Sequence, residues 1–432
     1  MMNGSIQNGI YYRKDQNIGN SFCIIFIKIN KYSKISDIGM RLSHLWSNIQ
    51  NLRDGIVKNL DISPAKRSAG NLTALIGYSS NIFSLESVKR KKPEHFKTQW
   101  DFCEPNPNGG GSILNGSKIC YANNVTYNPL KDCHIVLQFI ADSEFHTHRA
   151  LIETWKELYF ENERKDSDTN IAITNYYTGF QGANGRSLIG FHDGVSNVKS
   201  SDRLQTISIK SGPILEDYWV ENGTYLSFMR IIFNLKAWES LDIEKQEIII
   251  GRDKETGCPI IDFDNTGKPL KDRMCPVSGT HDVTDPGNEQ FRETSEYVNR
   301  YRSSSNFSDV LRNSHISRSN PFNSLMGKNT QTIKVFRQGF QFIEPEAFLT
   351  NFNIGLNFIC FQDSIEKLAT LLTYEDNKLD GVQPAHPQNL INFQDFFSVT
   401  SARNFLVPPL IDGEQFPGSS MFIDSNDIPA KN

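Results

Sequence analysis

Apolar residues gather along this chain in short runs whose length is typical of β-strands. The run at residues 21–29, SFCIIFIKI, is almost continuously apolar and rich in β-branched side chains, which indicates a buried strand. By the same pattern we predict further strands at residues 72–78, 134–141 and 171–180 in the first half, and at 224–235, 333–342 and 355–362 in the second.

Between these runs, apolar residues recur every three or four positions, which is the spacing of one face of an amphipathic helix. The first predicted helix begins after Ser36 and Asp37, a typical helix cap, and its core-facing stripe consists of Leu42, Leu45, Trp46, Ile49 and Leu52. A second helix is predicted from Ser143, with an apolar face formed by Leu151, Ile152, Trp155, Leu158 and Tyr159. Shorter helices are predicted at residues 241–250 and 365–374.

The order of strands and helices is similar in the two halves of the chain, and several strands alternate in polarity. We therefore predict an α+β protein of two ferredoxin-like domains, residues 1–180 and 181–432, each a β-α-β-β-α-β unit with an antiparallel sheet; the alternative is one doubly wound parallel sheet. Residues 103–118 are rich in Gly, Asn and Pro, and we interpret them as a surface loop without regular elements. Residues 251–332 form a long polar connection, and connections of that length are usually functional or disordered.

Composition excludes several classes of protein. Hydrophobic residues at 38% and charged residues at 22% are typical of a folded globular chain. The net charge of −4 argues against a nucleic-acid-binding surface, and the basic run at residues 89–92 is short enough to be a solvated loop. No apolar run is long enough to span a membrane, and we expect no secretory signal in the opening residues.

The seven cysteines are scattered and include no CxxC pair. Such a dispersed, odd-numbered set is typical of reduced thiols, so we expect a cytoplasmic protein without a disulfide framework or a zinc site.

The first candidate functional residues lie in the segment Gly190–Gly194, whose sequence is GFHDG. Glycines at both ends allow a sharp turn and a close approach to a ligand, while the turn presents the carboxylate of Asp193. The pattern is equally typical of an Asp-Gly hairpin turn without further function. His192 is a second candidate for the reactive group, because a neutral imidazole is a common proton carrier.

Two further candidates lie more than a hundred residues downstream. His315 lies in the segment SHISRSNPF, three residues before Arg318. Arg337 lies in a predicted strand and is flanked by Phe336, Phe340 and Phe342. A guanidinium in such apolar surroundings needs an anionic partner, for which a propionate, a carboxylate or bound peroxide would serve.

Taken in order, the motifs resemble those of the dye-decolourising (DyP-type) haem peroxidases. The motifs are GxxDG at Gly190, GTYLxxxRI at Gly223, GRDKxTG at Gly251, HIxRxNP at His315, FRxGF at Phe336 and GLxFxCFQ at Gly355. The resemblance covers essentially the whole chain. The length of the chain and its GRDKxTG element are most similar to those of the longer, cytosolic-type branches of the family. In one branch of the family, an asparagine lies two positions after the arginine that corresponds to Arg337, whereas this chain has Gly339 at that position.

The resemblance implies a haem b cofactor held mainly by the C-terminal domain. It implies His315 as the proximal iron ligand, Asp193 as the distal acid–base residue and Arg337 as the distal arginine. The cofactor-binding residues that it implies are His315, Arg318, Gly194, Leu356, Phe358 and Asp395. Asp395 would accept a hydrogen bond from the proximal imidazole, with Asp363 and Glu375 as alternatives for that acid.

The implied function is a peroxidase that uses hydrogen peroxide to oxidise dyes, phenols or other small reductants by one-electron steps. Its partners would be peroxide and a small reducing substrate, and we expect it to bind neither nucleic acid nor a membrane. The sequence does not decide whether the protein forms a homo-oligomer. The alternatives are a haem-binding or haem-handling protein with little turnover, and a non-haem protein whose motifs have become structural. The sequence does not identify the reducing substrate.

Overall fold

A computed structural model of the protein describes most of the chain. The described residues are 4–13, 16, 19–57, 68–96, 105–106, 110–113, 117–119, 128–159, 171–182, 185–195, 197–210, 215–271, 309–312, 314–319, 333–345, 352–376 and 396–423. Within these ranges, no helix is both long and apolar enough to cross a membrane.

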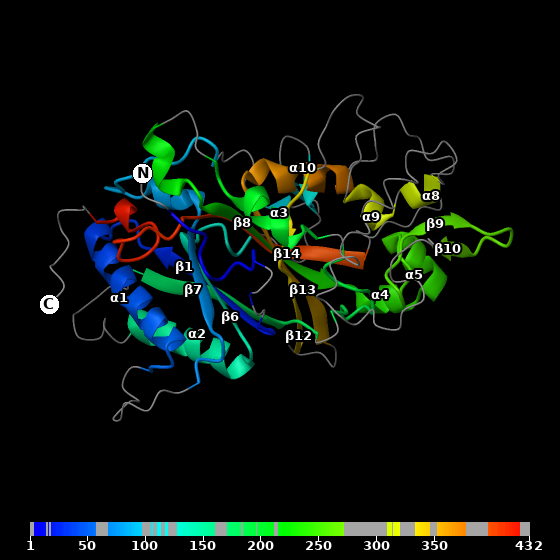
Figure 1. The fold of residues 1–432 in the computed structure, drawn as a ribbon, viewed down its shortest axis with the longest axis horizontal. Coiled ribbons are helices and arrows are strands. Elements are labelled where there is room, and N and C mark those ends of the chain that lie inside the picture. Colours follow the sequence, from blue (N-terminus) through cyan, green and yellow to red (C-terminus); the bar gives the residue numbers. More distant parts are fainter. Residues whose placement is uncertain are drawn as a thin grey trace.

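Residues of the first half form a four-stranded antiparallel sheet with the order β7-β1-β6-β2. Its strands are β1 (Ser21–Ile29), β2 (Thr73–Tyr78), β6 (Ile135–Ala141) and β7 (Ile171–Phe180). Helices α1 (Ile35–Arg53) and α2 (Glu144–Tyr159) connect them and pack on one face of the sheet (Figure 1). This order of elements confirms the predicted β-α-β-β-α-β unit.

The second half repeats this topology with the strand order β12-β13-β8-β14. Its strands are β8 (Thr224–Phe233), β12 (Phe340–Pro345), β13 (Phe352–Gln362) and β14 (Phe397–Val407). Helix α10 (Ile365–Asp376) connects β13 to β14 and covers the outer face (Figure 1). The other elements are η1 (Ser80–Ser84), α3 (Ser200–Ile207), η3 (Leu215–Val220), α4 (Leu235–Glu239), α5 (Ile243–Ile250), β9 (Ile260–Phe263), β10 (Pro269–Lys271), α8 (Asp309–Arg312), α9 (His315–Arg318) and η6 (Ser419–Met421).

The two four-stranded sheets join along both of their edges. Gln341 of β12 pairs with Phe180 of β7, and Leu406 of β14 pairs with Tyr78 of β2. The amide of Asn357 crosses the first of these seams and donates to the backbone oxygen of Thr178 over 2.9 Å. The α+β fold with two ferredoxin-like units is thus confirmed, although the sheets are continuous. The boundary between residues 180 and 181 stays a prediction.

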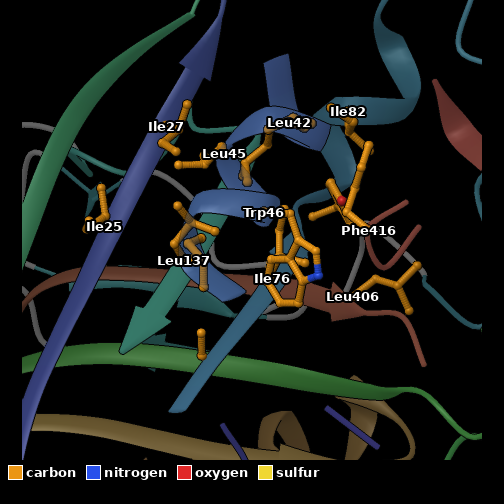
Figure 2. Packing of buried hydrophobic residues seen from close by; sticks show 14 of the residues in the cluster. Ile25, Ile27, Leu42, Leu45, Trp46, Ile76, Ile82, Leu137, Leu406 and Phe416 are labelled. Carbon is orange, nitrogen blue, oxygen red and sulfur yellow. The ribbon is translucent and has the colours of Figure 1, made fainter. Parts of the chain in front are cut away.

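The two largest apolar cores among the described residues lie on the two faces of the first sheet. The first lies between the first sheet and its helices, where Trp46 of α1 lies near Ile76 of β2 and Leu137 of β6 (Figure 2). The second lies between the two sheets and is rich in phenylalanine, with members that include Phe22, Phe26, Phe228, Phe340 and Phe405. Strands β1 and β6 contribute to both cores, which explains why their sequences are apolar at nearly every position.

The predicted apolar face of α2 was correct only in part, because Leu158 is buried and Leu151 and Tyr159 pack against the first core, whereas two predicted residues are exposed. Ile152 and Trp155 are 46% and 44% exposed, whereas Thr147, Ala150 and Thr154 are buried toward the sheet. Small side chains on the buried face let the helix approach closely. Thr147 also bonds through its hydroxyl to Ser21 over 2.8 Å, so a polar residue is satisfied there.

The strand predicted at residues 333–342 is interrupted. It consists of β11 (Phe336–Arg337) and β12, which lie end to end along the same edge of β13. Between them, the Gln338 side chain accepts from the backbone nitrogen of Tyr11 and donates to the backbone oxygen of Gly9. The chain therefore leaves the regular strand path where this buried amide anchors the N-terminal segment.

Two further expectations were wrong. Residues 103–118 were predicted to lack regular elements, but β3 (Pro105–Asn106), β4 (Gly110–Ile113) and β5 (Ser117–Ile119) form a small antiparallel sheet. Backbone pairing in short hairpins needs no apolar alternation, so the sequence pattern does not reveal it. The cysteines are also not all reduced, because Cys258 is disulfide-bonded, whereas Cys23, Cys133 and Cys360 are free and buried.

Gly355 in β13 is expected to be essential for stability. A methyl group there would collide with the backbone oxygen of Ile231 and lie 2.5 Å from the Phe342 ring. Because a paired backbone cannot shift easily, we expect Gly355→Ala to cost the upper part of the usual range of about 1–3 kcal/mol for an overpacked core. Gly339→Ala is the control, since its methyl would meet the end of the flexible Leu356 side chain. Thermal unfolding measures both variants; equal melting temperatures would contradict the expectation.

Candidate functional site

The segment GFHDG lies in the Asp193 loop (residues 185–195), where a tight turn over residues 187–191 includes its first two residues. The turn is closed by hydrogen bonds from Gly190 to Ser187 and from Ser187 to Phe191. Gly190 and Gly194 have φ of 90° and 74°, a left-handed conformation that favours glycine. The Asp-Gly hairpin interpretation is therefore wrong, because the turn lies before Asp193 and Gly194; Asp193 follows the turn and is exposed.

The surroundings of this aspartate are open on one side. A Cβ added to Gly194 would meet nothing within 4 Å among the described residues. One carboxylate oxygen of Asp193 accepts from the Gly194 backbone nitrogen over 2.7 Å, which orients the side chain. Among the described residues, the loop thus holds an exposed carboxylate next to a glycine that no other side chain contacts.

Arg337 lies within electrostatic range of this carboxylate. Burial lowers the pKa of the Arg337 guanidinium, and the negative charge of Asp193 opposes that effect, so the two groups are within electrostatic range. The guanidinium donates to the backbone oxygen of Val195 over 2.8 Å. The backbone of Arg337 also exchanges two hydrogen bonds with the Asn197 side chain. The structure therefore brings together two of the predicted catalytic residues, which are far apart in sequence.

An apolar sheet surface extends from Arg337. Leu356, Phe358 and Cys360 lie on one face of β13 because side chains alternate along a strand, and Arg337 pairs directly opposite Cys360 on that face. Leu356 and Phe358 are only partly buried, whereas α10 covers Cys360 with its apolar side chains. The absence of a side chain at Gly339 leaves room for Leu356. This surface can bind a flat apolar ligand next to the Arg337 charge.

His315 opens α9, a single helical turn that lies against α5 and α10. The imidazole is partly buried, and the backbone oxygen of His315 accepts bonds from both the nitrogen and the hydroxyl of Ser319. Ser314, the residue before it, is buried and donates its hydroxyl proton to Leu311. The helix that carries the predicted iron ligand is thus fixed at both ends.

A second loop links this helix to the Asp193 loop. The Arg252 loop (residues 251–259) begins at Gly251, whose Cα lies so close to α9 that an added Cβ would be 2.6 Å from the Ser314 hydroxyl. At Gly190, an added Cβ would be 2.5 Å from the Lys254 side chain. The Arg252 loop therefore touches both the segment carrying Asp193 and the segment carrying His315.

Arg252 itself is a site residue that sequence reasoning missed. Its side chain is 5% exposed, and its pKa is lowered to about 9, first by burial and then by the charge of Arg337. The sequence did contain a signal for this residue, since Arg252 belongs to the GRDKxTG motif. A charged residue in a polar connection is, however, normally predicted to be exposed.

His192 points away from the Asp193 carboxylate and toward the Arg252 loop. Its Nε2 lies 3.1 Å from the backbone oxygen of Glu255. Burial and the neighbouring Arg186 charge lower the pKa of His192, which favours a neutral ring. Arg186 is held by the backbone oxygens of Gly190, Lys254 and Glu255, so this side of the turn is mainly structural.

Several predicted site residues are not tested by the structure. Asp395 lies outside the described residues, as do the side chains of Arg318 and Glu375. Of the alternative acids, Asp363 is described, and it forms a 2.6 Å ion pair with Lys367 at the start of α10. The identity of the acid beside the proximal imidazole stays a prediction.

Comparison with known proteins assigns this chain to one family. Residues 184–411, more than half of the chain, match the family model for the C-terminal part of Dyp-type peroxidases. The chain belongs to the DyP-type peroxidase family.

Curated relatives and solved structures agree with this assignment. The deferrochelatases of Escherichia coli O157:H7 and of Escherichia coli strain K12 are each 25% identical over 183 residues, which is 42% of this chain and 35% of theirs. The matched region thus spans about a third of the curated relatives. A DyP-type peroxidase from Streptomyces coelicolor has the same fold, with a TM-score of 0.65 and 17% identity over 98% of this chain and 97% of that one. Ferric DtpA from Streptomyces lividans has a TM-score of 0.63 and 16% identity over 97% and 98% of the two chains.

A DypB variant from Rhodococcus jostii, solved in complex with heme, has a TM-score of 0.58 and 16% identity over 94% of this chain and 96% of its own. At such low identity these likenesses show the fold alone.

Proposed function

We propose that this protein is a haem-dependent peroxidase that uses hydrogen peroxide to oxidise dyes, phenols or other small reductants by one-electron steps. The observation that carries the proposal is the electrostatic proximity of Asp193 to the partly buried Arg337 at the edge of a partly exposed apolar sheet surface. Membership of the DyP-type family supports it, and a family neighbour is described in complex with heme.

The residues present fit a haem group. Leu356 and Phe358 supply an apolar surface for a flat ring, and His315 supplies an imidazole, a common axial ligand of haem iron. The open space at Gly194 leaves room beside Asp193 for a bound ligand. In this proposal His315 would hold the iron, and Arg318, Gly194, Leu356 and Phe358 would contact the ring.

When bound, the haem supplies the redox chemistry on which peroxide cleavage depends. Asp193 would take the proton from one peroxide oxygen and return it to the other, because the O–O bond breaks easily only when the leaving oxygen is protonated. Arg337 would stabilise the negative charge that develops on the oxygens. Its guanidinium is already held by Val195, so little reorganisation is needed during the reaction.

The hydrogen bonding supports Asp193 over His192 as the proton carrier. The His192 ring is directed at the Glu255 carbonyl, whereas Asp193 is exposed and interacts with the Arg337 charge. A carboxylate that is oriented by a backbone N–H and stays accessible suits repeated proton transfer.

Haem reconstitution tests the proposal. Apo-protein titrated with haem is expected to develop a Soret band that shifts when hydrogen peroxide is added, with turnover of a phenolic reductant well above that of free haem. In His315→Ala the ferric spectrum should change, because the axial ligand is lost. His44→Ala is the matched control, since His44 is exposed on α1. An unchanged ferric spectrum in His315→Ala would refute the ligand assignment.

A second candidate function is haem handling with little peroxidase turnover. The specific observation in its favour is that the curated relatives are named deferrochelatases. A peroxide reaction no faster than that of free haem, together with tight haem binding, would favour this function over the first.

A cytoplasmic location is likewise a proposal. The free, buried Cys23, Cys133 and Cys360 support it, whereas the disulfide at Cys258 is more typical of oxidising compartments. Fractionation of cells that express the native gene decides the point: recovery of the protein outside the cytoplasm would overturn the proposal.

A further inference from the structure

The outer face of α2 exposes large apolar side chains, although its inner face buries polar ones. Thr154 and Glu157 are buried toward the body of the protein. Phe145, in contrast, is 67% exposed, and nearly half of Ile152 and of Trp155 is exposed. Helix α2 lies at the periphery of the molecule (Figure 1). This distribution is the reverse of the one that the hydrophobic effect favours for a helix that contacts only its own chain.

The exposed residues follow the spacing of a coiled-coil seam. The α2 stripe consists of Phe145, His148, Ile152 and Trp155, and it ends at the partly buried Tyr159. The steps between these residues alternate between three and four positions, which is the heptad pattern of a helix that packs along a second helix. Trp155 and Tyr159 stack with ring centroids 5.5 Å apart, so their rings form one aromatic surface. Single exposed apolar residues need no explanation, but a heptad stripe indicates a helical partner.

Charged residues beside the α2 stripe indicate which helix this partner is. Arg149 and Lys156 lie along one edge of the stripe, where both form ion pairs with the buried Glu153, over 3.5 Å and 2.9 Å. Glu144 and Leu151 lie along the other edge. Opposite edges meet when two parallel helices pack around a two-fold axis, so Glu144 of each copy would lie near Arg149 of the other. In an antiparallel pair the two basic edges would meet and repel each other.

We propose that the α2 stripe is a dimerisation surface, on which a second copy of this chain packs its own α2 in a parallel orientation around a two-fold axis. The second copy supplies both a matching heptad stripe and the complementary charge. This inference goes beyond the proposed function and does not depend on it. Helix α2 has 16 residues, or about two heptads, whereas a self-sufficient coiled coil has about three or four. We therefore expect a weak dimer that forms at micromolar protein concentration.

Sedimentation velocity of the intact chain over a range of concentrations tests the proposal. Wild type is expected to shift from monomer to dimer as its concentration rises. Ile152→Glu and Trp155→Glu each place a charge within the stripe and should raise the dissociation constant of the dimer by at least about 10-fold. Ile243→Glu is the matched control, because Ile243 is 61% exposed but lies on α5. Circular dichroism and thermal unfolding report whether each variant is folded.

Cysteine cross-linking tests the orientation of the two helices. In a parallel pair, Phe145 lies opposite Phe145 of the second copy, close enough for a disulfide once both are cysteine, whereas in an antiparallel pair it lies opposite Trp155. Mild oxidation of Phe145→Cys should therefore give covalent dimers, and Ile243→Cys should not. Wild type oxidised in the same way gives the background from the native cysteines.

A charge exchange tests the contact between Glu144 and Arg149. Glu144→Arg and Arg149→Glu should each weaken the dimer several-fold, because each places like charges opposite one another. The double variant restores opposite charges and should recover the affinity of wild type. Such recovery could not follow from a merely local effect on α2.

The possible outcomes decide the proposal. A dimer that is lost in Trp155→Glu, kept in Ile243→Glu and trapped by Phe145→Cys supports it. Wild type that stays monomeric up to its solubility limit overturns it, as does a dimer that neither Ile152→Glu nor Trp155→Glu weakens. If Phe145→Cys forms no cross-link but its combination with Trp155→Cys does, the helices are antiparallel and the proposed arrangement is wrong. Monomeric wild type that binds phosphatidylglycerol vesicles through Trp155 would assign the stripe to a lipid surface instead.

Discussion

Asp193→Asn is expected to slow the reaction of the haem-loaded protein with hydrogen peroxide by about 100- to 10,000-fold, the usual contribution of a general acid–base group. Asparagine keeps the size of the side chain but can neither accept a proton from peroxide nor return one. Asp193 is exposed and held by the backbone nitrogen of Gly194, so the substitution should not disturb the fold. Stopped-flow absorbance after mixing with peroxide gives the rate directly.

His192→Ala is the control for this experiment. The ring interacts with the Glu255 carbonyl, and burial beside Arg186 lowers its pKa, so at neutral pH it is a neutral, structural side chain. We expect its removal to change the peroxide rate by much less than a lost general acid–base group does. If His192→Ala is the slower variant, the roles of the two residues are exchanged.

The sequence predicted much of the fold because the main packing surfaces are apolar. The run at residues 21–29 identified β1, and the spacing of Leu42, Leu45 and Trp46 identified the buried face of α1. Both elements pack against the first core, where burial of apolar side chains is the dominant favourable term. Patterns that follow from the hydrophobic effect can be read without a structure.

Elements that bury polar residues were missed or wrongly oriented. Strand β14 was not predicted, because its buried positions include Ser401, Arg403 and Asn404. Their burial depends on partners from distant segments: the Ser401 hydroxyl donates to that of Tyr177, and Asn404 accepts from Ser227 over 2.5 Å. Helix α2 was misjudged for the same reason, since Thr147 is buried through its bond to Ser21. A hydrogen-bond partner that is far away in the sequence leaves no periodic pattern in the local sequence, so the burial of such polar residues could not be predicted.

The candidate site was predicted only through its motifs. Nothing in the local sequence places Asp193 beside Arg337, because the contact depends on the way the loop after β7 folds back onto β11. The burial of Arg252 could not be predicted from the sequence, since a buried charge is identified only when the surrounding structure is known. The order of the motifs predicted which residues form the candidate site, and the structure shows how the charges of Asp193, Arg252 and Arg337 interact.

Arg337→Gln is expected to reduce the rate of the peroxide reaction by about 100- to 1,000-fold, the usual effect of removing a preorganised donor from a developing negative charge. The guanidinium is fixed by Val195 and lies within electrostatic range of Asp193, so under the proposed function both groups would act on the same molecule of peroxide. The two substitutions should therefore be non-additive, and Asp193→Asn combined with Arg337→Gln should be much less impaired than the product of the single effects.

Arg337→Lys separates charge from geometry in the same reaction. It keeps the positive charge but loses the planar fork of donors, so its rate should lie between those of wild type and Arg337→Gln. Because Arg337 also ties β11 to the Asp193 loop through Val195, haem affinity and apo-protein melting are measured for each variant. A peroxide rate that stays near wild type in Arg337→Gln, with haem bound and the fold intact, would show that this arginine does not stabilise the developing charge. Non-additivity with Asp193→Asn, at unchanged haem affinity, is the result that a merely structural arginine could not produce.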